Sequence, residues 1–145
     1  MISCTLSNDQ FAREHCAVAF DANNNTHVRG RASLDQDTGR LDFNLQLETD
    51  NVLRGPRGTM QVVLTDASNN PLVRIETPEA HIGGKPPGRA LIVDFPGQKI
   101  IPVDIARRVS NIDVAVQITG SSFDPFNGAL TDFVNAVRVI FMAAS

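Results

Sequence analysis

In two segments of the chain, every second residue is a large apolar one, and the residues between them are polar apart from one alanine. In residues 41–48, Leu, Phe, Leu and Leu alternate with Asp, Asn, Gln and Glu. In residues 112–119, Ile, Val, Val and Ile alternate with Asp, Ala, Gln and Thr. A β-strand sends successive side chains to opposite faces, so each segment predicts a strand with one buried face. The β-branched residues of the second segment also fit a pleated sheet.

Other short apolar segments, separated by turn residues, extend this pattern along the chain. The predicted strands are Cys16–Phe20, His27–Leu34, Leu41–Glu48, Thr59–Asp66, Leu72–Thr77, Ala90–Phe95, Gln98–Ile101 and Asn111–Thr119. We expect loops or turns at Asp35–Gly39, Asn51–Gly58, Pro78–Arg89, Pro96–Gly97 and Gly120–Gly128. Because Ala90–Phe95 is almost continuously apolar, it predicts a strand that is buried on both faces.

Helical signals are few and short. Ser7–Gln10 has the spacing of a capping box and predicts a helical turn over Asp9–His15, and a second turn is expected over Asp104–Val109. The segment 129–144 fits both helical spacing and a buried strand. Its β-branched residues favour a strand over Val134–Met142.

These patterns indicate an all-β protein. We expect an antiparallel β-sandwich or jelly roll of about eight to nine strands with one or two short helical turns, and a closed barrel is the alternative. A chain of 145 residues fits one domain, 1–145. Since it has no run of about 20 apolar residues, we expect no membrane span. The sequence shows no signal peptide, which favours the cytoplasm, with a previously cleaved leader left open.

The charge and aromatic content weigh against several kinds of ligand. The net charge is -3, and a basic face of the kind that displaces counterions from a duplex is not indicated, so we expect no nucleic-acid partner. The chain has no Trp and no Tyr. Aromatic platforms are typical of sugar-binding surfaces and of proteins that stack single-stranded bases, so the sequence disfavours both functions.

The cysteines and histidines do not have the spacing of a metal site. His15 and Cys16 are adjacent, and adjacent residues on a strand point to opposite faces, while His27 and His81 are far apart in the sequence. We therefore predict no metal and no cofactor. Cys4 and Cys16 are either bridged or free thiols, and the sequence leaves both open.

Motifs of the common enzyme classes are missing from the sequence. No serine lies in a G-x-S-x-G elbow, and residues 82–86 lack both the spacing of a phosphate-binding loop and a following helix. These absences favour a non-catalytic protein over an enzyme. The alternative is a small enzyme or ligand-binding protein that uses the Gly/Pro-rich loop, where His81, Lys85 and Arg89 are the candidate ligand-binding residues.

Four arginines are candidates for binding an anion. Arg29 and Arg31 are two residues apart, which places them on the same strand face. Arg54 and Arg57 share a predicted loop. If the two pairs converge they form an anion site, and if they do not they belong to a solvated face or protect a sheet edge.

Apolar residues outside the alternating strands suggest contacts with a partner. Phe123 and Phe126 lie in a polar loop, where they either cover the core or act as interface contacts. The segment 129–144 is almost wholly apolar and fits burial within the domain or against another subunit. We therefore predict a non-catalytic β-sandwich module that binds an unknown protein or small-molecule partner or self-associates, with a homo-oligomer as a hypothesis.

Overall fold

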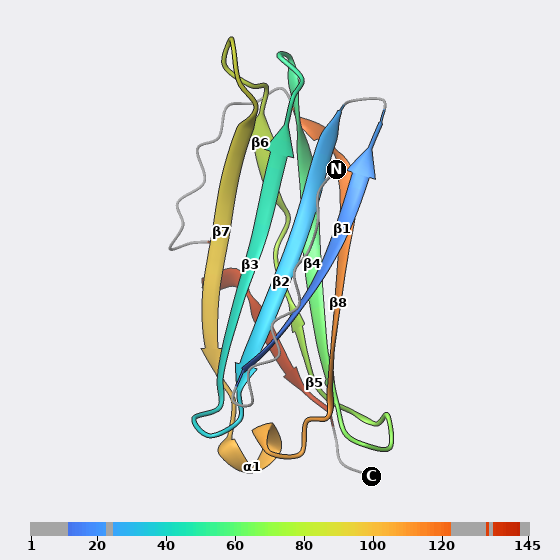
Figure 1. The fold of residues 1–145 in the computed structure, drawn as a ribbon, viewed down its shortest axis with the longest axis vertical. Coiled ribbons are helices and arrows are strands. Elements are labelled where there is room, and N and C mark those ends of the chain that lie inside the picture. Colours follow the sequence, from blue (N-terminus) through green and yellow to red (C-terminus); the bar gives the residue numbers. More distant parts are fainter. Residues whose placement is uncertain (1–11, 23–24, 123–132, 134, 143–145) are drawn as a thin grey trace.

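The computed structural model describes residues 12–22, 25–122, 133 and 135–142. Over these residues it contains nine strands and one short helix, arranged as two antiparallel sheets that face each other (Figure 1). The prediction of an all-β sandwich is confirmed, and the predicted number of strands is correct for the described part of the chain.

Sheet A consists of four strands in the order β1-β2-β3-β7. Their bounds are β1 (Ala12–Asp21), β2 (Thr26–Asp35), β3 (Arg40–Thr49) and β7 (Leu91–Ile100). Figure 1 shows these strands side by side, with β1 and β7 at the two edges. Every neighbouring pair is antiparallel and continuous in register, so the sheet presents regular rows of side chains across its four strands.

Sheet B is built around one long strand, β4 (Arg54–Thr65). β8 (Asn111–Ser122) pairs with one side of β4, and β6 (Ala80–Gly83) and β5 (Pro71–Glu76) share the other side. β9 (Arg138–Phe141) pairs with β5. The helix α1 (Val103–Ala106) lies between β7 and β8 at one end of the sandwich and confirms the predicted helical turn there (Figure 1).

The core is the layer of side chains between the two sheets. On β3, the four apolar members of the alternating segment are buried, and none is more than 4% exposed: Leu41, Phe43, Leu45 and Leu47. From sheet B, the opposing layer is supplied by Met60, Val62, Leu64, Val73, Ile75 and Ile112. The other apolar residues of β8 pack against this core while remaining partly exposed. The predicted direction of both alternating segments is therefore confirmed.

The N-terminal helical turn predicted over Asp9–His15 is wrong for the residues that are described. Ala12 to His15 belong to β1, where each pairs with a residue of β2. Pairing along a whole strand satisfies the backbone more completely than one isolated turn, so the sheet overrides the capping signal. Residues 9–11 lie outside the described part of the chain.

β7 corrects two predictions about residues 90–101. The chain does not turn at Pro96–Gly97, because β7 runs through both residues and stays paired with β3 from Leu91 to Ile100. A proline is tolerated in an edge strand, and the ring of Phe43 covers the position where Gly97 has no side chain. The strand is also not buried on both faces, since Ile92 is 52% exposed.

Three loops are shorter in the structure than the sequence predicts, because strands extend into them. β4 begins at Arg54, inside the loop predicted at Asn51–Gly58, and β6 lies inside the one predicted at Pro78–Arg89. β8 continues to Ser122, beyond the predicted start of the Gly120–Gly128 loop. In each case a neighbouring strand supplies backbone partners that local turn residues do not reveal.

Both readings of the C-terminal segment hold in part. The strand predicted over Val134–Met142 is limited to β9, residues 138–141, where it pairs with β5. Phe133, Asn135 and Ala136 have a helical backbone. The Phe133 ring packs on Phe95 of β7, with ring centroids 5.3 Å apart. The apolar side chains of Phe133 and Val137 are therefore buried within this domain.

The core position of Leu45 gives a direct test of this fold. Leu45→Ala removes a side chain that is 0% exposed, and we expect it to lower the free energy of unfolding by about 2–5 kcal/mol. Urea unfolding followed by circular dichroism measures this loss. The matched control is Leu53→Ala, since Leu53 is 67% exposed and its truncation is expected to change stability by less than about 0.5 kcal/mol. Equal losses for the two variants would contradict the assigned core.

Candidate functional site

The outer face of sheet A carries a dense set of polar and charged side chains. Buried and partly exposed residues alternate along β2 and β3, so the residues between the buried ones point away from the core. On β2 the outward residues include His27, Arg29 and Arg31, so the prediction that these two arginines share a strand face is confirmed. On β3 the outward residues are Asp42, Asn44, Gln46 and Glu48.

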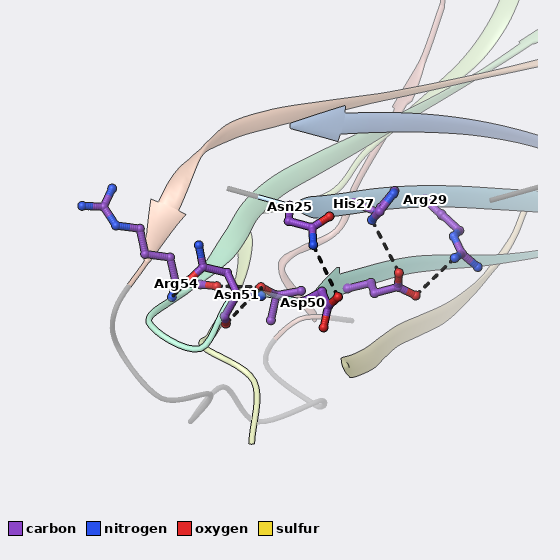
Figure 2. A network of polar contacts seen from close by, with 8 residues as sticks. Asn25, His27, Arg29, Asp50, Asn51 and Arg54 are labelled. Carbon is purple, nitrogen blue, oxygen red and sulfur yellow. Dashed lines mark hydrogen bonds and ion pairs between the residues drawn. The ribbon is translucent and has the colours of Figure 1, made fainter. Parts of the chain in front are cut away.

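A single carboxylate joins the two basic side chains at one end of β2. Glu48 lies opposite His27 in register, and its Oε2 is 3.5 Å from the His27 Nδ1. The Arg29 Nη2 donates to the other oxygen of Glu48 at 3.3 Å. Figure 2 shows His27 and Arg29 both reaching toward this carboxylate from the neighbouring strand. Since all three side chains are about four-fifths buried, these contacts are protected from solvent more than ordinary surface ion pairs.

The ring of Phe20 covers His27 from the other side. The two rings are stacked, with centroids 4.4 Å apart and planes inclined by 27°. Burial lowers the pKa of His27 from its ordinary value of 6.5, the Glu48 carboxylate opposes that shift, and the Arg29 guanidinium adds to it. The imidazole is therefore mainly neutral at pH 7.

A second carboxylate extends the polar surface to the edge of the sheet. Asp94 lies on β7, opposite Gln46 in register. Its Oδ1 accepts a hydrogen bond from the Gln46 Nε2 at 2.8 Å and another from the Asn44 Nδ2 at 2.9 Å. The polar contacts thus continue across β2, β3 and β7.

Exposed apolar side chains flank these polar residues on both edge strands. Phe20 on β1 is 55% exposed and Ile92 on β7 is 52% exposed. In register, Phe20 lies opposite His27, and Ile92 lies opposite Glu48. Phe20, His27, Glu48 and Ile92 therefore form one row across the four strands, which we call the cross-strand row. Val18, which is 39% exposed, lies beside Phe20 on the same face of β1.

A shallow depression lies further along the same face. Its volume is about 360 Å³, and it is lined by Arg31, Ala32, Ser33, Asp42, Phe43 and Asn44. A second depression, of about 490 Å³, lies on sheet B and is lined by residues of β4, β5 and β8 together with Thr77. Both open to solvent, unlike the enclosed apolar pockets that bind small molecules tightly.

Lys85 has a structural partner at the β3–β4 turn. Its Nζ is 3.0 Å from Asp50 Oδ1, and its backbone N–H donates to the Asn51 carbonyl at 2.8 Å. Asp50 also accepts from Asn25 at 3.4 Å (Figure 2). A side chain at Gly84 would collide with the carbonyl oxygen of Val52, so the two loops approach each other at their backbones. The Gly/Pro-rich loop is therefore fastened to this turn.

The three residues predicted to bind a ligand have different neighbours. His81 lies on β6, opposite Arg57 of β4, whereas Lys85 contacts Asp50. Arg89 is exposed in the bend that follows β6. Their predicted ligand site stays a prediction.

The four predicted anion-binding arginines are divided between the two sheets. Arg29 and Arg31 lie on the outer face of sheet A, while Arg57 on β4 binds Glu79 at 3.2 Å. Figure 2 shows Arg54 directed away from His27 and Arg29. Phe123 and Phe126, predicted as a core lid or interface contacts, lie outside the described residues, as does Cys4.

The surroundings of His27 give a titration that can be measured. We expect NMR titration of the imidazole to give a pKa below 6.5 in the folded protein. Glu48→Gln removes the carboxylate that favours the charged imidazole and should lower the pKa further, while Arg29→Met should raise it. A measured pKa at or above 6.5 in the unsubstituted protein would contradict the described burial.

The sign of the effect on stability follows from the same shift. The unfolded chain has the higher His27 pKa, so it takes up protons first as the pH falls. The stability contributed by neutral His27 is present above pH 6.5 and is lost as the pH falls toward the folded pKa. Urea unfolding of the protein and of His27→Gln across this range should show a smaller loss in the variant.

Three further observations concern metal binding, membrane spans and similarity to known proteins. Among the described residues, no group of three or more His, Cys, Asp or Glu side chains is placed to hold a metal ion. No helix in that part of the chain has the length and apolar content needed to cross a membrane. The chain matches no protein-family model, no curated protein and no solved structure.

Proposed function

We propose that this chain is a non-catalytic β-sandwich module that self-assembles into a homo-oligomer through the outer face of sheet A. The observation that supports this function best is the position of its exposed apolar side chains. Val18, Phe20 and Ile92 occupy both margins of a sheet face whose middle is polar. Apolar groups gathered on one surface are typical of interfaces, where aromatic and Arg side chains are enriched.

The apolar surface continues around one end of the sandwich. β1 ends, β3 turns into β4 and β7 begins at this end (Figure 1). The turn carries Val52 and Leu53, which are 62% and 67% exposed. Burial of apolar area favours association, and this end of the face carries most of the exposed large apolar side chains of the described residues.

The polar middle of the face is compatible with burial. Glu48 already contacts His27 and Arg29, and Asp94 already accepts two hydrogen bonds from amide side chains. Charges that enter an interface with their partners in place leave fewer groups unpaired. The described contacts of His27 are with Glu48 and the Phe20 ring, neither of which is a serine or cysteine nucleophile. These contacts favour binding over catalysis.

Self-assembly can be tested by measuring mass in solution. Sedimentation velocity and light scattering at micromolar concentration should give a mass above the 15.7 kDa of one chain. Phe20→Ser should weaken the association at least about tenfold, because loss of one buried aromatic contact exceeds the roughly 1.4 kcal/mol that a factor of ten requires.

A matched control is available on the other sheet. Phe141 on β9 is 52% exposed, close to the 55% of Phe20, so Phe141→Ser removes a similar side chain away from the proposed interface. It should leave the oligomer unchanged. A monomer mass for the unsubstituted protein over the whole concentration range, or equal weakening by both substitutions, would overturn the proposal.

A further inference from the structure

The order of residues in the cross-strand row points to a particular mode of assembly. We infer that two copies of this chain dock the outer faces of their sheets A against each other, related by a two-fold axis that runs parallel to the strands between β2 and β3. This inference rests on the proposed function and names the partner as a second copy. The evidence for it is the set of residues that face each other when the strand order of sheet A is reversed in the second copy.

The cross-strand row has an apolar residue at each end and a base beside an acid in the middle. From β1 to β7 it contains an apolar residue, a base, an acid and an apolar residue: Phe20, His27, Glu48 and Ile92. A two-fold axis parallel to the strands reverses this order in the second copy. Phe20 then faces Ile92 of the second copy at both margins, and His27 faces its Glu48. Each interface contact occurs twice, as a closed two-fold dimer requires.

The other outward residues of β2 and β3 keep the same complementarity. In register, Arg29 lies opposite Gln46, Arg31 opposite Asn44, and Ser33 opposite Asp42. Reversal places each of these residues over its register partner in the second copy, so a base meets an amide and a hydroxyl meets an acid. β2 ends at the acidic Asp35 and β3 begins at the basic Arg40, which continues the pattern. No like charges are brought together along these two strands.

The alternative two-fold axis in the plane of the face is disfavoured by charge. An axis perpendicular to the strands keeps the strand order and stacks β2 on β2 of the second copy. Because this axis also reverses the direction of β2, Arg31 near its centre meets Arg31 of the second copy, while Arg29 lies over Ser33 and His27 over Asp35. Like charges placed together across an interface are unfavourable, so the Arg31 contact favours the axis parallel to the strands, which brings no like charges together on β2 and β3.

The area of the face fits a stable dimer. Sheet A has four strands of ten residues each. At strand spacings of about 4.8 Å and a rise of about 3.3 Å per residue, the face covers roughly 600 Å². Two such faces bury roughly 1,200 Å², which is the lower bound for specific protein–protein interfaces. The flanking apolar residues at the end of the sandwich add to this area.

An exchange of charges tests the arrangement. One variant carries His27→Glu and Arg29→Glu, which makes β2 acidic. The other carries Gln46→Lys and Glu48→Lys, which makes β3 basic. Each variant alone should associate at least about tenfold more weakly than the unsubstituted protein, because like charges then face each other. An equimolar mixture should recover a dimer, since the acidic residues introduced on β2 of one variant then meet the lysines introduced on β3 of the other.

The possible outcomes separate this inference from the proposed function. A mixture that stays monomeric, while the unsubstituted protein dimerises and Phe20→Ser weakens it, would overturn the two-fold arrangement but leave self-assembly standing. A monomeric unsubstituted protein would overturn both. Circular dichroism of each variant shows whether it is folded, because the substitutions also place like charges beside each other within one chain.

A second measurement leaves the charged residues unchanged. In a Cys4→Ser, Cys16→Ser background, a nitroxide is attached at Ile100→Cys, which is 63% exposed on β7. Mixed with a ¹⁵N-labelled chain of the same background without the label, it reports only contacts between copies. The parallel axis predicts broadening of amides at the start of β1, near Ala12. Broadening at β7 of the second copy in place of β1 would overturn the arrangement.

Discussion

The packing of alternate apolar side chains between the two sheets determines where the other residues of this protein lie. Once Leu45 and its neighbours on β3 point inward, Gln46 and Glu48 must point outward, and a shift of one residue would exchange the two faces. The continuous register of sheet A passes this constraint to β1, β2 and β7. The packing of the core therefore determines the cross-strand row. Its members are outward-facing residues that lie between the buried residues of four strands in continuous register.

The parts of the fold that could be predicted are those in which both faces of a strand have a clear chemical character. Residues 41–48 show this pattern, since every second residue is apolar and the others are polar. β7 lacks it, because Leu91, Ile92 and Val93 are all apolar although only one face of the strand meets the core. β6 is four residues long and lies within a Gly- and Pro-rich stretch, so only its pairing with β4 distinguishes it from a loop. Pairing between distant segments is not encoded in local composition.

The same distinction applies to the candidate site. The two-residue spacing of Arg29 and Arg31 is a local feature, and it was sufficient to place them on one face. Their neighbours Glu48 and Asp94 come from other strands, and their positions depend on the register of β2, β3 and β7. Phe20 was also missed as a surface residue. The large residues of its segment alternate with alanines, so composition does not say which set faces the core.

The proline in β7 limits how further strands could add to this edge of sheet A. An edge strand offers backbone groups to which further strands can add without limit, and this is the route to fibrils. Pro96 lies near the middle of β7 and has no N–H to offer an incoming strand. Continuous addition of strands along this edge is therefore interrupted, which disfavours amyloid-like polymerisation through β7.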